Sequence, residues 1–363
     1  MSKVKITGNA SGTGVLTLEA PNTNTDRTIS LPDSTDTLVG QSTTNALAAT
    51  DTALTTRVNA VGGRKNLIIN GGFDVWQRGT SFTKTSAGTA YHADRWSTYY
   101  NSNTITKVQE ILGSTKQNCL KISQSTTANP FEISLKLEDS SVYSGKTFTI
   151  SFYAKSSTGF SDLTISAFLR NASMTNLDSQ YFASNVTIGT SFTKYSYTFT
   201  MLDKSALTLG EPGSHLGITF QRAYGIADFT ITQVQLELGD QATDFEHRSY
   251  GEELALCQRY YQFGSTSTTY AGFANGANQN YFAVSLTTPL RSSPTVTRSI
   301  SGAGWTSLKH NGSNISTTTP AVVTYVAGAS NIAMKQTGHS GLSDMHVTNI
   351  YTAGSYIIFD AEL

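Results

Sequence analysis

Aromatic residues beside asparagine, serine and glycine are the part of this sequence best suited to binding chemistry. They gather in and around two expected loops, 266–280 and 302–314, and the candidates are Tyr270, Phe273, Asn275, Asn278, Tyr281 and Trp305. Tyrosine offers a rigid amphipathic surface, and Asn, Ser and Gly offer adaptable hydrogen bonding, as in antibody loops. A ligand rich in hydroxyl groups, such as a glycan, fits this chemistry. For the pair Tyr260 and Tyr261 two interpretations stay open, contact with such a ligand and packing between protomers.

Two of the three tryptophans, Trp76 and Trp96, lie 20 positions apart in the sequence. They could stack on a sugar or fill the core of a sheet. Because tryptophan covers a large apolar area and a first strand must anchor its sheet, we expect both to build the fold. In an extended strand, Phe73 and Val75 would share one face, and Asp74 would share the other face with Trp76.

The sequence offers little support for a catalytic site or a metal-binding site. A glycosidase needs two carboxylates that converge on one cleft, whereas the adjacent Glu252 and Glu253 are expected to point in different directions. Cys257 has no evident histidine partner that would make it a nucleophile. His92 and Asp94 are typical of a solvated turn. No hydrolase, metalloprotease, P-loop or dinucleotide fingerprint occurs, so we predict that the protein is not an enzyme.

The composition excludes several classes of partner. Charged residues make up 14% of the chain, against about a quarter in ordinary globular proteins, and Lys+Arg and Asp+Glu both number 25. The resulting net charge of zero gives no long-range field to attract nucleic acid or an anionic membrane. The sequence has no apolar run of the roughly 20 residues that a membrane helix needs and no signal-peptide pattern. We expect synthesis in a cytoplasm, no membrane insertion and no nucleic-acid binding.

The N-terminal part predicts an attachment segment and a neck. Residues 1–40 have the pattern of short β-strands and are too few to bury a core of their own. Within 41–63, Leu47, Leu54 and Val61 are spaced by seven, as in a heptad seam. Because a lone helix of this length is barely stable in water, we predict a short coiled coil, a trimeric helical neck. The alternative is one amphipathic helix packed on a neighbouring domain.

The rest of the chain has the pattern of an all-β protein. Strand-like runs through 64–248 favour a jelly roll or β-sandwich, and a change of phase within 228–238 suggests a bulge. Residues 249–363 predict a second β unit, a C-terminal tip domain that begins with a helix at 251–261. The last strand, within 355–363, is apolar on both faces, which is typical of a central strand or of a subunit interface.

Four strings carry a resemblance to a known family: "NLIINGGFDVWQRGTSF", "ADRWS", "SGKTFTISFYAKS" and "ITQVQLELGDQATDFEHR". They are similar to the jelly-roll modules of the carbohydrate-binding family 4/9 type. This resemblance implies a glycan-binding jelly roll. It also implies a structural Ca²⁺ with oxygen ligands from Asn70, Asp74 and Glu237. No other cofactor is expected.

Three further strings lie in the C-terminal part: "RSYGEELALCQRYYQFG", "FAVSLTTPLRSSPTVT" and "YIIFDAEL". They resemble the distal part of bacteriophage tail-fibre proteins, of the kind found in phages of aquatic bacteria, cyanobacteria included. The resemblance implies a structural virion protein, a homotrimeric tail fibre made in the host cytoplasm. Residues 1–40 would join other phage tail proteins, and the distal domains would attach to a bacterial surface polysaccharide. The alternatives are a glycan-cleaving tailspike depolymerase and a purely structural tail connector or decoration protein.

Overall fold

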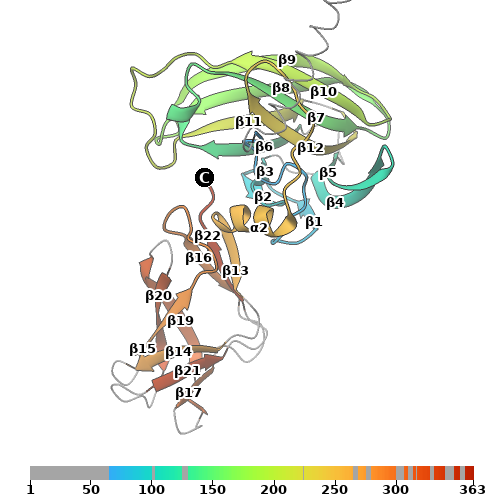
Figure 1. The fold of residues 1–363 in the computed structure, drawn as a ribbon. Coiled ribbons are helices and arrows are strands. Elements are labelled where there is room, and N and C mark those ends of the chain that lie inside the picture. The colour runs from blue at the N-terminus through green and yellow to red at the C-terminus, as the bar shows by residue number, and fades with distance from the viewer. Residues whose placement is uncertain are drawn as a thin grey trace, which may run out of the picture. The chain divides into compact units, whose positions relative to one another are not determined.

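The computed structural model describes most of the chain from Lys65 onward (Figure 1). The described residues are 65–99, 103–124, 130–223, 225–264, 269–274, 279–299, 306–309, 314–315, 317–327, 331–339, 347–351 and 356–363. Beyond residue 263, side chains are described at 272, 281–297 and 357–363. The expected N-terminal strands and the neck residues Leu47, Leu54 and Val61 lie outside the described residues.

Two six-stranded antiparallel sheets form a jelly roll. The first sheet has the order β1-β4-β5-β12-β7-β10, and the second has the order β2-β3-β6-β11-β8-β9. The strands are Ser81–Lys84 (β1), Ala90–Tyr91 (β2), Trp96–Thr98 (β3), Asn103–Leu112 (β4), Thr115–Gln124 (β5), Phe131–Glu138 (β6), Thr147–Lys155 (β7), Phe160–Arg170 (β8), Asn176–Ile188 (β9), Thr193–Thr200 (β10), His215–Arg222 (β11) and Asp228–Leu238 (β12). A short 3-10 helix, Ser140–Val142 (η1), links β6 to β7.

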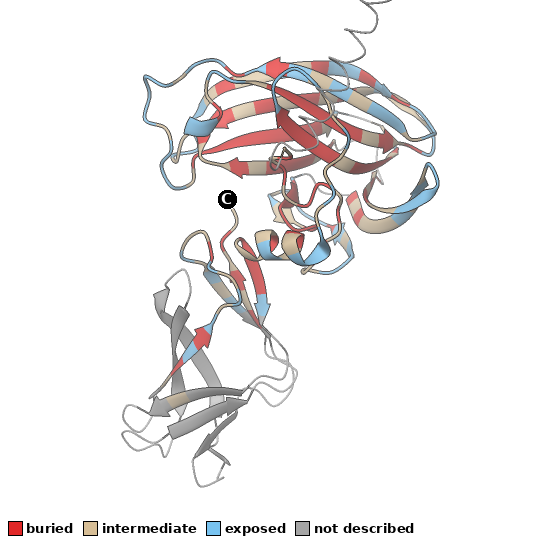
Figure 2. Cartoon of the chain, viewed as in Figure 1, coloured by how far each residue is buried: buried red, intermediate tan, exposed pale blue. Residues whose placement is uncertain are grey.

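Apolar side chains from both sheets fill the space between them, and Figure 2 shows the buried residues along these strands in red. In β7 the side chains of Phe148, Ile150 and Phe152 are fully buried, and in β11 those of Ile218 and Phe220 are as well. Burial of apolar surface on this scale is the main stabilising contribution to such a sandwich. The predicted fold class, an all-β chain with a jelly roll and a C-terminal β tip, is confirmed.

The opening segment, 65–76, is joined to β12 although it is not a strand. Asn66 Nδ2 donates to the carbonyl of Val234 at 3.2 Å, and Val234 N donates to the carbonyl of Gly71 at 2.9 Å. A Cβ on Gly71 would lie 2.1 Å from the Val234 oxygen, so this approach requires glycine. The pairing of β12 with β7 shifts register around Gln233, which confirms the predicted bulge.

Both tryptophans of the opening region belong to the core, as predicted. Trp96 is fully buried, its indole N–H donates to the carbonyl of Asn70 at 3.0 Å, and Trp76 is 9% exposed. The predicted alternation of faces along 73–76 is wrong, because Phe73 has a φ of 56° and leaves the extended region. As a result Phe73, Val75 and Trp76 are all buried.

The C-terminal part contains helix α2 (Tyr250–Gln258) and two further sheets. A three-stranded sheet places β22 (Tyr356–Asp360) between β13 (Tyr261–Gly264) and β16 (Thr295–Ser299), so the last strand is central, one of the two predicted positions. A seven-stranded sheet has the order β18-β17-β21-β14-β15-β20-β19. Its strands are Thr269–Ala274 (β14), Gln279–Ser285 (β15), Thr306–Lys309 (β17), Asn314–Ile315 (β18), Thr317–Ala327 (β19), Asn331–His339 (β20) and Val347–Tyr351 (β21). None of the described helices is both long and apolar enough to span a membrane.

Two arginines of the jelly roll bind the residues that follow β22, and we call this contact the arginine junction. Arg95 pairs with Glu362, and its guanidinium lies 3.4 Å from the ring centroid of Tyr260. Arg78 lies 3.3 Å from the other oxygen of Glu362 and 3.6 Å from the ring centroid of Tyr261. Both tyrosines are buried in the junction, so neither is an exposed ligand contact.

Glu362→Gln is expected to destabilise the protein strongly. Arg95 is 3% exposed, so its guanidinium would stay buried without the counter-charge that now pairs with it. Removing one partner of a buried ion pair costs roughly 3–5 kcal/mol of unfolding free energy. Urea unfolding followed by the fluorescence of the buried Trp96 measures this loss.

The matched control is Asp162→Asn. Asp162 pairs with Arg222 at 2.6 Å, but its side chain is 40% exposed, so we expect a loss of about 1 kcal/mol or less. Equal losses from the two substitutions would contradict a special role for the arginine junction.

Candidate functional site

The outer face of the second sheet carries an aromatic ring among polar side chains. Because Leu216, Ile218 and Phe220 of β11 point into the core, the residues between them point outward. The strand register then places Lys136, Gly217 and Phe168 in one row across β6, β11 and β8. We call this surface the second-sheet face and define it by Glu132, Ser134, Lys136, Phe168, Arg170, His215, Gly217 and Thr219.

The ring of Phe168 lies flat against the backbone of Gly217. A Cβ at Gly217 would lie 2.1 Å from a ring carbon of Phe168, so only glycine admits the ring in this position. The Arg170 guanidinium lies 4.6 Å from the centre of the same ring, and the edge of the ring meets His215 with 6.4 Å between centroids. An aromatic surface is therefore held among hydrogen-bonding groups.

Three buried polar atoms of this face have no hydrogen-bond partner among the described residues: Arg170 Nε, His215 Nε2 and Thr219 Oγ1. Leaving such an atom buried and unpaired costs about 1–3 kcal/mol. Native proteins keep few of them, so three on one face of one sheet call for an explanation. A polar ligand that pairs with them would remove this cost.

The imidazole of His215 is neutral on this face. Burial lowers its pKa to about 4, against a rise caused by the hydrogen bond with the Gly213 carbonyl, and the nearby cations Lys136, Arg170 and Arg95 lower it further. Because Nδ1 lies 2.9 Å from that carbonyl, we assign the proton to Nδ1. The Nε2 atom is then an acceptor.

The outer face of the first sheet is covered by residues 239–248 of its own chain. Thr243 N donates to a Glu237 carboxylate oxygen at 2.9 Å, and the Gln235 side chain donates to the carbonyl of Asp244 at 3.1 Å. Lys194 donates to the carbonyl of Thr243 at 3.1 Å. The second-sheet face is covered in part as well, since Ser134, His215 and Thr219 are buried and Lys136 donates to the carbonyl of Leu363.

The structure brings some of the predicted tip residues together. Phe273 and Tyr281 stand directly opposite each other on β14 and β15, and Tyr270 lies on the same strand as Phe273. These three residues are therefore in strands, and the prediction that they occupy loops is wrong. Asn275, Asn278 and Trp305 lie outside the described residues.

The three predicted calcium ligands have separate partners. The Asn70 amide oxygen accepts from Val75 N at 3.0 Å, Asp74 accepts from the Asn118 side chain at 2.6 Å, and Glu237 accepts from Thr243. Groups of three or more His, Cys, Asp or Glu side chains placed to hold a metal do not occur in the described part. Calcium binding stays a prediction.

The expected solvated turn at His92 and Asp94 is wrong, since both residues are buried. Arg78 lies 3.1 Å from Asp94, and burial nonetheless raises the pKa of this carboxyl to about 6. Burial also raises the pKa of the Cys257 thiol well above its usual value, as expected for an unreactive cysteine.

Sequence analysis missed the second-sheet face. The available signal was the alternation in "LTISAFLR", where Leu163, Ile165, Ala167 and Leu169 are buried and Phe168 is on the opposite side. An aromatic residue at the polar phase of a strand marks a surface position. The contributions of Thr219 and His215 depend on β11, which lies about 50 residues further along the chain.

Comparison with known proteins agrees with the jelly roll. Residues 65–209 match the model of a family described as carbohydrate binding domain. This part of the chain resembles a carbohydrate-binding module. A search of curated proteins finds no match.

Similar solved structures are distant. The enzymatically active domain of tailspike protein 4 from bacteriophage CBA120 is 15% identical with a TM-score of 0.32, and the match covers 48% of this chain and 21% of that chain. The CBM22-1 xylan-binding domain of Paenibacillus barcinonensis Xyn10C is 16% identical with a TM-score of 0.31, covering 44% and 99%. A cyclase from Fischerella sp. TAU is 14% identical with a TM-score of 0.33, covering 50% and 99%. The chain thus spans about a fifth of the tailspike chain.

His215→Asn is expected to flatten the loss of stability in acid. Between pH 6.5 and about 4 the unfolded state binds a proton at this imidazole and the folded state does not. The stability therefore falls as the pH falls, and this one group accounts for about 3 kcal/mol at most. Asparagine keeps an amide donor for the Gly213 carbonyl but does not titrate.

The measurement is the free energy of unfolding in urea at several values between pH 7 and pH 4, for both proteins. His92, whose pKa burial also lowers to about 4, acts in the same direction, and Asp94 acts in the opposite one. His92 and Asp94 are present in the wild type and in His215→Asn, so their contributions cancel when one pH profile is subtracted from the other. Parallel pH profiles would contradict the assignment of a neutral, buried His215.

Proposed function

We propose that the protein binds carbohydrate through the second-sheet face of its jelly roll. The observation that carries this proposal is that the segment matching the carbohydrate binding domain, 65–209, presents Phe168 and Arg170 on that face beside unpaired polar atoms. Binding sites for small ligands combine apolar or aromatic surface with a few placed polar groups. A sugar ring offers a C–H face to an aromatic surface and hydroxyl groups to the polar side chains.

Hydroxyl groups match the three unpaired atoms in kind. Arg170 Nε is a donor, His215 Nε2 is an acceptor, and Thr219 Oγ1 is both. A hydroxyl donates and accepts, so sugars can satisfy all three. Because the three atoms are buried, a ligand would reach them only after neighbouring side chains such as Phe168 and Arg170 move.

The finer proposal is attachment of a phage to a bacterial surface polysaccharide. It is supported by the tail-fibre resemblance of residues 249–363 and by the heptad pattern of 41–63. Weak contacts repeated over three chains would give strong avidity. The net charge of zero suits recognition through hydroxyl groups rather than through charge. The tip aromatics Tyr270, Phe273 and Tyr281 are a second place where the same polysaccharide would bind.

We further propose that binding is not followed by cleavage. Three carboxylates with largely buried side chains in the described part are engaged with arginines: Asp94 with Arg78, Glu362 with Arg95 and Glu253 with Arg248. A retaining or inverting glycosidase needs two carboxyl groups free to act on one bond, about 5–10 Å apart. New reducing ends in a polysaccharide incubated with the protein would favour the depolymerase instead.

Light scattering of the full chain is expected to give three times the mass of one chain. Leu54→Asp places a charge in the predicted seam of the neck, so we expect it to shift the mass toward the monomer. Leu238→Asp, the same substitution at a side chain 58% exposed at the end of β12, is the matched charge change and should leave the mass unchanged. A monomeric wild-type protein would contradict the predicted trimer and the avidity that depends on three chains.

Phe168→Ala is expected to weaken binding to a polysaccharide at least tenfold, because it removes the aromatic surface of the face. Arg170→Ala removes an unpaired donor and a charge, and a similar loss is expected. The assay is binding of the full chain to an array of bacterial surface polysaccharides and to intact cells that carry the bound ones.

Lys155→Ala is the control for these two substitutions. Lys155 lies 4.8 Å from the ring centroid of Phe192, a cation–aromatic pair like that of Arg170 and Phe168, but it belongs to the first sheet. Its binding should equal that of the wild type. Absence of binding to every polysaccharide would favour the structural connector, and equal binding by all variants would move the site away from the second-sheet face.

A further inference from the structure

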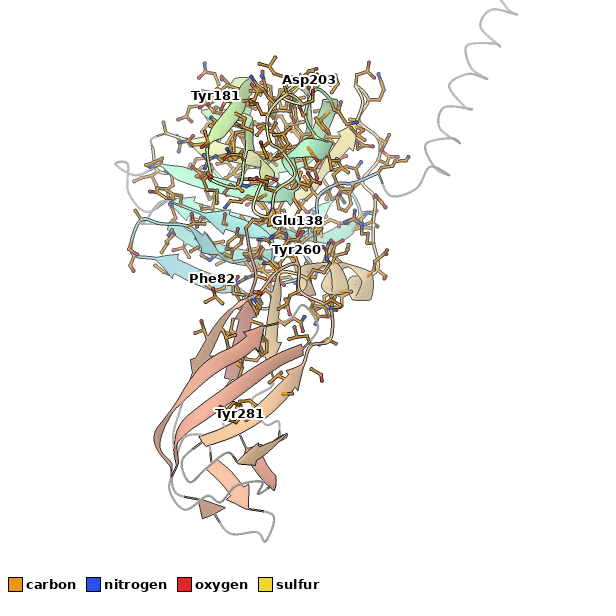
Figure 3. All side chains as sticks on the ribbon, turned by 90° about the vertical axis from the view of Figure 1, so that its left-hand side faces the viewer. Phe82, Glu138, Tyr181, Asp203, Tyr260 and Tyr281 are labelled. Carbon is orange, nitrogen blue, oxygen red and sulfur yellow. The ribbon has the colours of Figure 1, made fainter. Side chains whose placement is uncertain are left out.

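A cavity of about 300 Å³ lies at the end of β6, beside Tyr260, which comes two residues after the end of helix α2. Its walls come from the opening segment, β6, η1 and Tyr260. The lining residues are Leu67, Ile69, Arg95, Leu135, Lys136, Leu137, Glu138, Asp139, Tyr143 and Tyr260. Figure 3 shows Glu138 and Tyr260 next to each other at this place.

The cavity follows from the unequal lengths of neighbouring strands. β3 begins at Trp96, which stands opposite Leu135, so the pairing stops before β6 ends. Arg95 takes the next position and donates to the carbonyl of Lys136. Arg95 also lies against the ring of Tyr260, which closes the cavity from the side of α2.

The lining has an apolar part and a polar part. Leu67, Ile69 and Leu137 supply aliphatic surface, and Tyr143 and Tyr260 add two aromatic side chains. This mixture is unlike a core cavity, which is lined by apolar groups and stays dry. It resembles small-molecule sites, where a few polar groups stand on an apolar wall.

The polar part includes an acceptor without a donor. Glu138 Oε1 is buried and has no hydrogen bond among the described residues, and the nearest cation, Arg291 Nε, is 3.9 Å away. The other oxygen, Oε2, lies 3.4 Å from Arg259. A carboxylate oxygen in this state favours a ligand that brings an O–H or N–H group.

We infer that this cavity is a second ligand site, which takes a single pyranose ring. The ring would set its C–H face on the aliphatic and tyrosine side chains and donate a hydroxyl to Glu138 Oε1. A volume of about 300 Å³ is sufficient for one sugar ring. The second-sheet face instead extends across β6, β11 and β8. The two sites adjoin, because Lys136 belongs to both and Glu138 stands opposite His215, so the test variants are chosen to distinguish them.

The test uses saturation-transfer NMR on the full chain with the methyl glycosides of glucose, galactose, mannose and N-acetylglucosamine. Each is taken to about 100 mM, because ligands of this size bind weakly. At least one glycoside should bind saturably. Ile69→Trp, which fills the cavity, should abolish that signal. Ile111→Trp, the same change at a side chain 66% exposed on β4, should leave it unchanged.

Two further variants keep the test decisive. Glu138→Gln removes the charge of the acceptor and should weaken binding about tenfold; if Ile69→Trp does not fold, an unchanged affinity in this variant overturns the inference. A signal that survives Ile69→Trp but disappears in Phe168→Ala comes from the second-sheet face and also overturns it. So does the absence of binding by all four glycosides.

Discussion

The buried guanidinium of Arg95 is the constraint on which the rest of the arrangement depends. Its charge is tolerated away from water because three kinds of partner surround it: the Glu362 carboxylate, the carbonyl of Lys136 and the ring of Tyr260. Burial, the largest single contribution, would lower its pKa, but Glu362 together with Tyr260, Tyr91 and Cys257 raises it overall. Arg95 has a φ of 73°, so the chain accepts backbone strain at this position to place the side chain.

This placement explains why both candidate sites adjoin β6. Arg95 ends the pairing of β3 with β6, and the space left at the edge is the cavity that Tyr260 closes. On the outer face of the same strand, Lys136 donates to the carbonyl of Leu363 at 2.6 Å, so the C-terminal residues border the second-sheet face. The positive charges of Arg95 and Lys136 near His215 favour its neutral form, which leaves Nε2 as an acceptor.

Local patterns predicted the parts of the fold that depend on neighbours in sequence. The bulge in β12 follows from the change of phase of its apolar residues, and the central place of β22 is one of the two positions that its two apolar faces indicated. The turns of the opening segment could not be predicted from such a pattern, because Asn70 and Phe73 adopt positive φ, which is uncommon for residues other than glycine. The packing of Tyr260 and Tyr261 within the chain was not predicted, because their partners, Arg95 and Arg78, lie more than 160 positions away in the sequence.

The distribution of charge ties the fold to the kind of ligand it suits. Only 14% of residues are charged, and several of these charges are enclosed in the arginine junction rather than spread over the surface. A buried ion pair adds little to stability compared with an apolar contact, and its value is in fixing one geometry. Here that geometry keeps β22 and its neighbours on the jelly roll. The second-sheet face keeps the charged Glu132, Lys136 and Arg170 beside its hydroxyl, imidazole and aromatic groups, so the proposed sugar ligand would meet charge as well as hydrogen-bonding and aromatic surface.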